Sequence, residues 1–100
     1  MADNPNFPIS TAAISWFDGS GGLHIRVYSS DGYTITERCS DSGGPGWTTG
    51  SFSQPGSAVS ATVWVSGGEA QIRIYCTSAD QTTEWANTSS GWVKGTYTTT

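Results

Sequence analysis

Apolar and polar residues alternate along several short stretches of this 100-residue sequence. In His-Ile-Arg-Val-Tyr, which begins at His24, the pattern has the period of two that is typical of a half-buried β-strand. Segments rich in Gly, Ser, Asp and Pro separate these stretches, and such residues favour loops. We therefore expect strands at residues 11–17, 23–29, 33–39, 47–52, 59–65, 70–77, 81–86 and 92–97.

Two parts of the chain repeat each other. Ile-Arg-Val-Tyr is followed by Thr-Glu in the first copy, and Ile-Arg-Ile-Tyr is followed by Thr-Glu in the second. Glu37 comes 11 residues after Arg26, and Glu84 comes 11 residues after Arg73. The two arginines lie 47 residues apart, and a fixed period of this length indicates a repeat architecture.

The first copy contains a hairpin signal. Residues 31–32 are Asp-Gly, which is typical of a two-residue turn because both residues tolerate a positive φ. Such a turn places Arg26 directly opposite Glu37 on one face of the sheet, with their Cβ atoms about 5 Å apart. The same reasoning places Arg73 opposite Glu84. We therefore expect one cross-strand pair of an arginine and a carboxylate in each copy.

Each repeat has the size of a propeller blade, with four short antiparallel strands in about 45 residues. We expect an all-β chain with an N-terminal tail at 1–10, one blade repeat at 11–56 and a second at 57–100. Two blades cannot close a ring, because propellers typically have four to eight blades. Two, three or four copies of the chain would give four, six or eight blades. An eight-stranded sandwich is the competing architecture.

Composition excludes several classes of function. The net charge is −4 with four basic residues, which argues against nucleic acid as a partner. No apolar run approaches the ~18 residues of a membrane span, so we expect no direct membrane insertion. The N-terminus lacks the basic and apolar regions of a conventional signal peptide, which suggests a cytoplasmic or non-classically secreted protein. We expect Cys39 and Cys76 to be free and buried. Because His24 is the single histidine, we expect no metal or other cofactor.

Several longer strings carry a resemblance to a known family. They are Ile-Arg-Val-Tyr, Ile-Thr-Glu-Arg-Cys, Gly-Trp-x-x-Gly-x-Phe, Thr-Thr-Glu-Trp and Gly-Trp-Val-Lys-Gly-Thr-Tyr. In this order, over residues 11–98, they resemble the fucose-binding lectins of the Aleuria aurantia type, and look most like its short bacterial members. The resemblance implies a six-bladed β-propeller that three two-blade chains close as a homotrimer. It also implies multivalent binding of L-fucose or fucosylated glycans between adjacent blades.

The resemblance assigns sugar-binding residues to two sites. Each site takes an Arg, a Glu and a backbone amide from one blade and a Trp from the next blade. For the first site these are Arg26, Glu37, the amide of Ser51, and Trp92; for the second they are Arg73, Glu84, the amide of Thr96, and Trp47 of a neighbouring chain. The family typically has a further aromatic residue just after the Glu strand. Ser40 and Asn87 stand at those positions here, so each site is expected to lack one aromatic wall.

The residues themselves leave alternatives open. Each Arg–Glu pair could be only a cross-strand ion pair, which contributes about 0.2–1 kcal/mol. We interpret Trp16 and Trp64 as packing between blades rather than ligand contacts, and Trp85 as packing or surface. A glycosidase is disfavoured because it needs two carboxylates at one bond, and no second carboxylate recurs in both repeats. The remaining alternative is a propeller scaffold for protein–protein interaction.

Overall fold

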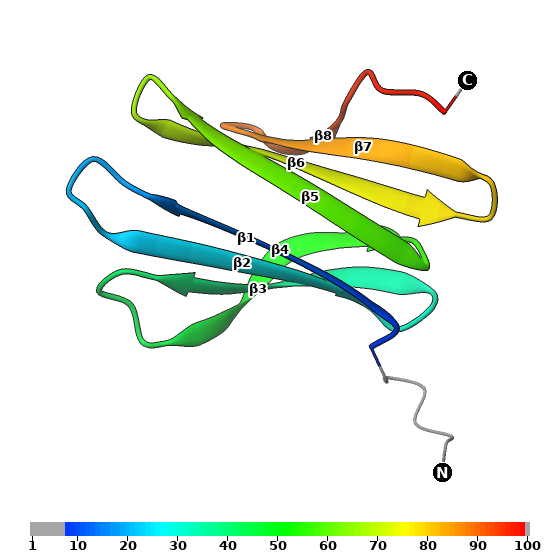
Figure 1. Ribbon diagram of the computed structural model, residues 1–100, viewed down its shortest axis with the longest axis horizontal. Helices are drawn as coiled ribbons and strands as arrows, with labels where there is room; N and C mark the ends of the chain where they lie inside the picture. Colours follow the sequence, from blue (N-terminus) through cyan, green and yellow to red (C-terminus); the bar gives the residue numbers. More distant parts are fainter. Residues whose placement is uncertain (1–7, 100) are drawn as a thin grey trace, which may run out of the picture.

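The computed structural model describes residues 8–99, which form two four-stranded antiparallel sheets. Each sheet is a simple meander, in which every strand pairs with the next strand along the chain. Figure 1 shows the two sheets as separate layers. The first contains β1 (Ser10–Phe17), β2 (Leu23–Ser30), β3 (Thr34–Asp41) and β4 (Trp47–Pro55). The second contains β5 (Ala58–Ser66), β6 (Glu69–Ser78), β7 (Gln81–Thr88) and β8 (Gly91–Lys94). The eight predicted strands are therefore confirmed, and the pair of sheets is consistent with two propeller blades.

The register of the first central hairpin differs from the predicted one. Ser30 pairs with Ile35 rather than with Tyr33, so Tyr28 lies opposite Glu37 and Arg26 lies opposite Cys39. The loop is longer because its aspartate makes an Asx turn. Its carboxylate accepts hydrogen bonds from the amides two and three residues later, at 2.9 and 3.0 Å. The predicted direct opposition of Arg26 and Glu37 is therefore wrong by two residues, although both remain on one face.

The register of the second central hairpin also differs from the predicted one, but for another reason. Ser78 pairs with Gln81 around a two-residue turn, in which Ala79 has a φ of 57°. The predicted opposition of Arg73 and Glu84 requires a turn at residues 78–79, one residue earlier in the chain than the turn observed. As a result Arg73 lies opposite Ala86, and Glu84 lies opposite Tyr75. The predicted direct opposition of Arg73 and Glu84 is wrong as well.

The last strand of each blade is also interrupted beside the glutamate. In β4 the pairing with β3 shifts between Thr36 and Arg38, which marks a β-bulge at residues 50–52. In the second blade β8 ends at Lys94 rather than at the predicted Tyr97. The chain leaves the regular ladder at the equivalent place in both blades, but only the first blade resumes pairing afterwards.

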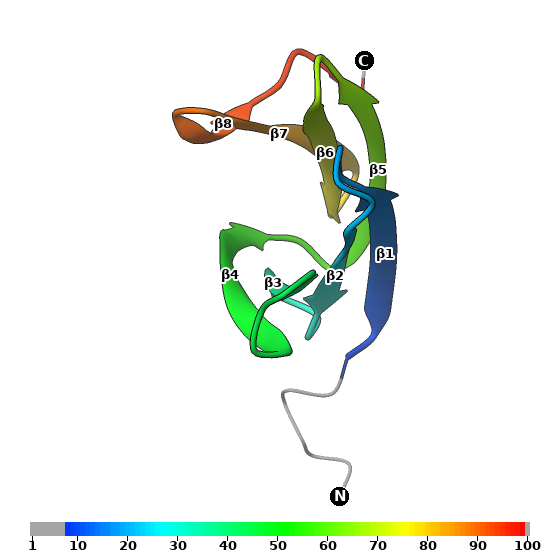
Figure 2. The same ribbon diagram turned by 90° about the vertical axis from the view of Figure 1, so that its left-hand side faces the viewer.

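The two blades pack face to face, and the inner strands β1 and β5 lie side by side. In the view of Figure 2, β1 and β5 lie on one side of the molecule and β4 and β8 on the other. The core consists of apolar side chains from the facing sheets. They are Ile14, Tyr28, Ile35 and Phe52 of the first blade and Ile72, Ile74 and Cys76 of the second. The first sheet contributes the face that carries Tyr28, whereas the second contributes the face that carries Ile74, which is equivalent to the opposite face of the first sheet. The packing is therefore head-to-tail.

Gly56 joins the blades, and its carbonyl oxygen accepts a 2.6 Å hydrogen bond from the buried hydroxyl of Ser30. Cys39 and Cys76 are free and buried, as predicted. Most of the predicted N-terminal tail, residues 1–7, lies outside the described residues. No helix that could cross a membrane occurs in residues 8–99.

Truncating a core side chain should destabilise the whole pair of blades. Ile74 is fully buried between the sheets, whereas Ile9 is 62% exposed. We expect Ile74→Ala to lower the free energy of unfolding by about 2–5 kcal/mol, because it leaves a cavity. The matched change Ile9→Ala should stay within about 0.5 kcal/mol of wild type. Urea denaturation at one fixed protein concentration measures both, and equal losses would contradict the described interface.

Candidate functional site

Glu37 is a buried carboxylate with fixed partners. Its side chain belongs to a residue that is 4% exposed, and its Oε2 accepts a 2.6 Å hydrogen bond from the hydroxyl of Tyr28. Its Oε1 accepts a 3.2 Å hydrogen bond from the amide of Phe52. Burial and the contact with Glu37 raise the pKa of Tyr28 far above its usual range, so its hydroxyl remains a donor. Both carboxylate oxygens are therefore held in place before any ligand arrives.

The bulge in β4 is what makes room for this carboxylate. A Cβ atom on Gly50 would contact the Glu37 side chain, with only 2.6 Å to its Cδ atom. Because glycine has no Cβ, the strand can pass close beside the carboxylate and turn the Phe52 amide toward it. A glycine is thus required at position 50 because of the close Glu37 side chain and not because of the backbone angles at this position.

The second blade repeats this arrangement with the same residue types. Tyr75 donates a 2.7 Å hydrogen bond to Oε2 of Glu84, and the amide of Tyr97 donates a 3.0 Å bond to Oε1. A Cβ on Gly95 would again contact the glutamate, at 2.7 Å from its Cδ atom. The Tyr75 bond, followed by the Tyr97 and Thr96 amides, holds the pKa of Glu84 below its usual range.

The two arginines each lie over a tryptophan ring. The guanidinium carbon of Arg26 is 5.1 Å from the ring centroid of Trp16, and that of Arg73 is 4.9 Å from Trp64. These distances are typical of cation–π contacts. Each Nη1 also donates a 3.0 Å hydrogen bond to the carbonyl oxygen of the preceding residue. Both tryptophans therefore contact candidate sugar-binding residues, a contact that our interpretation of them as packing between blades did not include.

In the first blade the arginine has a further, charged partner. Arg26 Nη1 donates a 2.8 Å hydrogen bond to Oδ1 of Asp41, which also lies 2.7 Å from Nδ1 of His24. The other ring nitrogen, Nε2, lies 2.7 Å from Oδ2 of Asp18. The contact with His24 is the largest cause that lowers the pKa of Asp41, and together with two loop amides it lowers that of Asp18 to about 2.

The structure places the predicted aromatic and amide residues as follows. Trp92 reaches from the second blade and packs edge-on against Phe52 and Tyr28 of the first, with ring centroids 4.7 and 6.4 Å apart. Trp92 is therefore brought to the Glu37 side of the first site. Trp47 is 50% exposed in one chain. Ser51 and Thr96 each precede the residue whose amide binds the glutamate.

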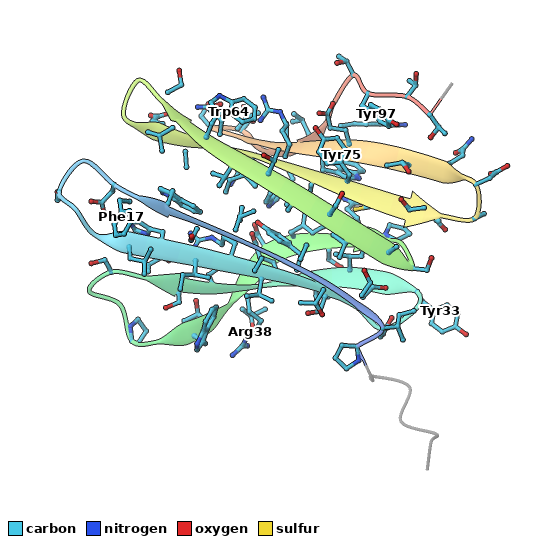
Figure 3. The ribbon with its side chains drawn as sticks, in the orientation of Figure 1. Phe17, Tyr33, Arg38, Trp64, Tyr75 and Tyr97 are labelled. Carbon is cyan, nitrogen blue, oxygen red and sulfur yellow. The ribbon has the colours of Figure 1, made fainter. Side chains whose placement is uncertain are left out.

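The two sites differ in what covers them. Tyr28 is fully buried beneath the second blade, whereas Tyr75 is only half-buried. Figure 3 shows Trp64, Tyr75 and Tyr97 on the side of the second sheet that faces away from the first. The cluster around Glu84 is thus open in a single chain, where the cluster around Glu37 is closed by the neighbouring blade.

A polar hollow of about 540 Å³ lies between β7 and the C-terminal segment. Its lining includes Thr82, Thr83, Lys94 and Tyr97, but neither arginine and neither glutamate of the two clusters. Tyr97 links it to the Glu84 cluster through a backbone amide. We therefore take the two repeated clusters as the candidate functional sites.

Each repeated cluster offers a fixed carboxylate, a guanidinium and an indole ring on one face of a blade. The carboxylate can accept hydrogen bonds from hydroxyl groups, the guanidinium can donate hydrogen bonds to them, and the indole ring can cover an apolar C–H face. Together these interactions are the chemistry of a carbohydrate-binding protein. The model of the family described as fungal fucose-specific lectin matches residues 3–100. The chain belongs to this family. A search of the curated proteins found no match. Lectins of this family are not catalytic, so the protein is a carbohydrate-binding lectin and not an enzyme.

The close approach of Gly50 to the glutamate can be tested by a double-mutant cycle. We expect Gly50→Ala to cost about 1–3 kcal/mol of stability, because the added methyl group overpacks the site. In a Glu37→Ala background most of that cost should disappear, since the clashing side chain is gone. Gly19→Ala is the control, because a Cβ there meets nothing within 4 Å. Thermal unfolding measures all four variants, and additive effects would contradict the described contact.

Proposed function

We propose that this lectin binds L-fucose and fucosylated glycans at two sites per chain, each lying between adjacent blades. The observation that carries the proposal is the recurrence of the same hydrogen-bonded Tyr–Glu pair beside an Arg–Trp pair in both blades. The match to fucose-specific lectins over nearly the whole chain supports the choice of sugar.

The register supports a ligand between the arginine and the glutamate. Arg26 and Glu37 are diagonal neighbours, and such positions are about 7–8 Å apart. Arg26 forms an ion pair with Asp41. The carboxylate of Glu37 is therefore not neutralised by direct contact with this arginine. The hydroxyl groups of a sugar ring that bridges the two residues can accept a hydrogen bond from the guanidinium and donate one to the carboxylate. Because both protein groups are charged, both hydrogen bonds are strengthened.

The aromatic component comes from the neighbouring blade. In the first site Trp92 is contributed by the second blade of the same chain. The equivalent tryptophan for the second site, Trp47, lies on the first blade, so it would have to come from another chain. Ser40 pairs with Trp47 in the first blade, and Asn87 pairs with Trp92 in the second. With these polar residues at the family's other aromatic position, we expect weak binding to one sugar and stronger binding to dense glycans through multivalency.

A ring of three chains would supply the missing partner. The buried Ile74 of the second blade corresponds to Val27 of the first blade, and Val27 is only half-buried. The open face around Tyr75 corresponds in turn to the closed face around Tyr28. The outer faces of one chain therefore correspond to the two faces that pack against each other between its own blades. Repeating that contact head-to-tail would close a homotrimeric, six-bladed propeller with six sites.

Removing the carboxylates should weaken sugar binding strongly. We expect Glu37→Gln together with Glu84→Gln to weaken L-fucose binding by roughly ten-fold or more, because charge-assisted hydrogen bonds contribute about 1.5–3 kcal/mol. Glu69→Gln removes the same charge at an exposed position in β6 outside both clusters and should leave binding unchanged. Isothermal titration with L-fucose measures all three proteins. Intact binding by the double variant would show that the sites are assigned to the wrong residues.

The proposed ring can be tested separately from sugar binding. We expect light scattering to report about three times the 10.5 kDa of one chain at micromolar concentration. Val27→Asp should shift the protein to the monomer while retaining its β-sheet circular dichroism spectrum, because a charge would be buried at the contact between chains. A wild-type monomer, or a trimer that tolerates Val27→Asp, would overturn this assembly.

A further inference from the structure

His24 lies between two carboxylates that come from different parts of the first blade. Its Nδ1 is 2.7 Å from Asp41 on β3, and its Nε2 is 2.7 Å from Asp18 in the loop between β1 and β2. The side chain of His24 is 18% exposed. The same Oδ1 atom of Asp41 accepts the 2.8 Å hydrogen bond from Arg26. A continuous chain of polar contacts therefore leads from the loop through the histidine to the arginine of the first site.

The indole of Trp16 completes this cluster. It stacks on the His24 ring at 5.3 Å with an interplanar angle of 14°, and Arg26 lies over the same indole. Arg26 is thus fixed by three contacts: the indole, a backbone carbonyl oxygen and Asp41. Two of these, the indole and Asp41, are themselves in contact with His24.

The second blade lacks this chain of contacts. Gln71 pairs with Trp64 as His24 pairs with Trp16, and Thr88 stands where the first blade has Asp41. Arg73 keeps its indole and its carbonyl oxygen. Within residues 8–99, no carboxylate lies within salt-bridge distance of it.

We propose that protonated His24 positions Arg26 for sugar binding through Asp41, so that the first site weakens as the pH rises while the second site does not. The inference rests on the proposed function of Arg26 and Glu37, and adds to it that the two sites are unequal and that one is regulated. His24 acts as a positioning residue, because it contacts Arg26 only through Asp41 and Trp16.

The direction of the effect follows from the donors of the imidazole ring. Only the protonated ring carries two N–H groups, so only this form can donate to both carboxylates. The contact with Asp41, followed by that with Asp18, raises the pKa of His24 above its usual range. The clamp is therefore complete below the ordinary pKa of histidine and is lost as the pH rises through the raised value. After the proton is lost, one ring nitrogen faces a carboxylate without a hydrogen, and that contact must break.

The other groups around the ring do not compete with this titration. Asp18 and Asp41 are the acidic groups against it, and both have lowered pKa values. The guanidinium group of an arginine is not deprotonated in proteins, and an indole ring such as that of Trp16 carries no charge. Burial raises the pKa of the neighbouring Cys39 thiol, which moves it further from neutral pH. His24 is thus the group of this cluster that changes charge near neutral pH.

NMR tests the clamp without any sugar. His24 is the one histidine of the sequence, so its ring signals need no assignment. We expect its titration midpoint to lie above that of histidine in an unfolded chain, and to fall in Asp41→Asn and in Asp18→Asn. The Nε–H signal of Arg26 should shift with the same midpoint, and that of Arg73 should not. An ordinary midpoint, or an Arg26 signal that ignores it, would overturn the inference whatever the protein binds.

Titrations with L-fucose then test the regulation of the site. In a Glu84→Gln background, which leaves the first site, we expect affinity to fall by roughly three- to ten-fold between about pH 5.5 and about pH 9. In a Glu37→Gln background, which leaves the second site, it should stay constant over the same interval. His24→Gln, which copies Gln71 of the second blade, should remove the pH dependence of the first site.

The outcomes separate this inference from the proposed function. Equal pH profiles at the two sites, with fucose bound at both, would overturn the positioning role alone. Loss of fucose binding in the wild-type protein at every pH would overturn the proposed function, and the NMR titration would still decide whether His24 holds Arg26 in place.

Discussion

The packing of one blade on the next is the constraint on which the rest of the structure depends. The face that carries Arg26, Tyr28 and Glu37 lies against the apolar face that carries Ile72 and Ile74. Tyr28 takes part in both the core and the candidate site, because its ring is buried at the interface while its hydroxyl holds the glutamate. The packing of the blades and the geometry of the candidate site at Glu37 are therefore coupled at this residue.

Much of the fold could be predicted because the alternation of residues is simple. All eight strands and the duplication are visible in the sequence, and the boundaries fall within a few residues of those observed. The register was harder to predict, since it depends on the conformation of two turns. The carboxylate of Asp31 extends the first turn by binding backbone amides, and Ala79 adopts a positive φ without a glycine to signal it. A slip of two residues keeps every side chain on its face, which is why the faces were predicted correctly and the pairs were not.

The candidate site was predicted in part, and mostly through the family resemblance. Trp92 packs against Tyr28 and Phe52, the two residues that bind Glu37, at the interface of the blades. The tyrosine partner of each glutamate was not predicted. The signal was present in both repeats, because a residue two positions after the arginine must share its face. The contact between each arginine and the tryptophan of the first strand needed the three-dimensional structure, as did the two carboxylates around His24.

The head-to-tail packing of two unlike repeats has an evolutionary consequence. In the proposed ring, one kind of seam is made within a chain and the other between chains, and each kind has its own set of residues. The first seam carries His24 and Asp41, while Gln71 and Thr88 occupy the corresponding places at the second. A substitution in either repeat therefore changes alternate seams around the ring and leaves the others as they were. In such a ring, half of the proposed sites would be free to drift toward new ligands or conditions while the other half would keep the original residues.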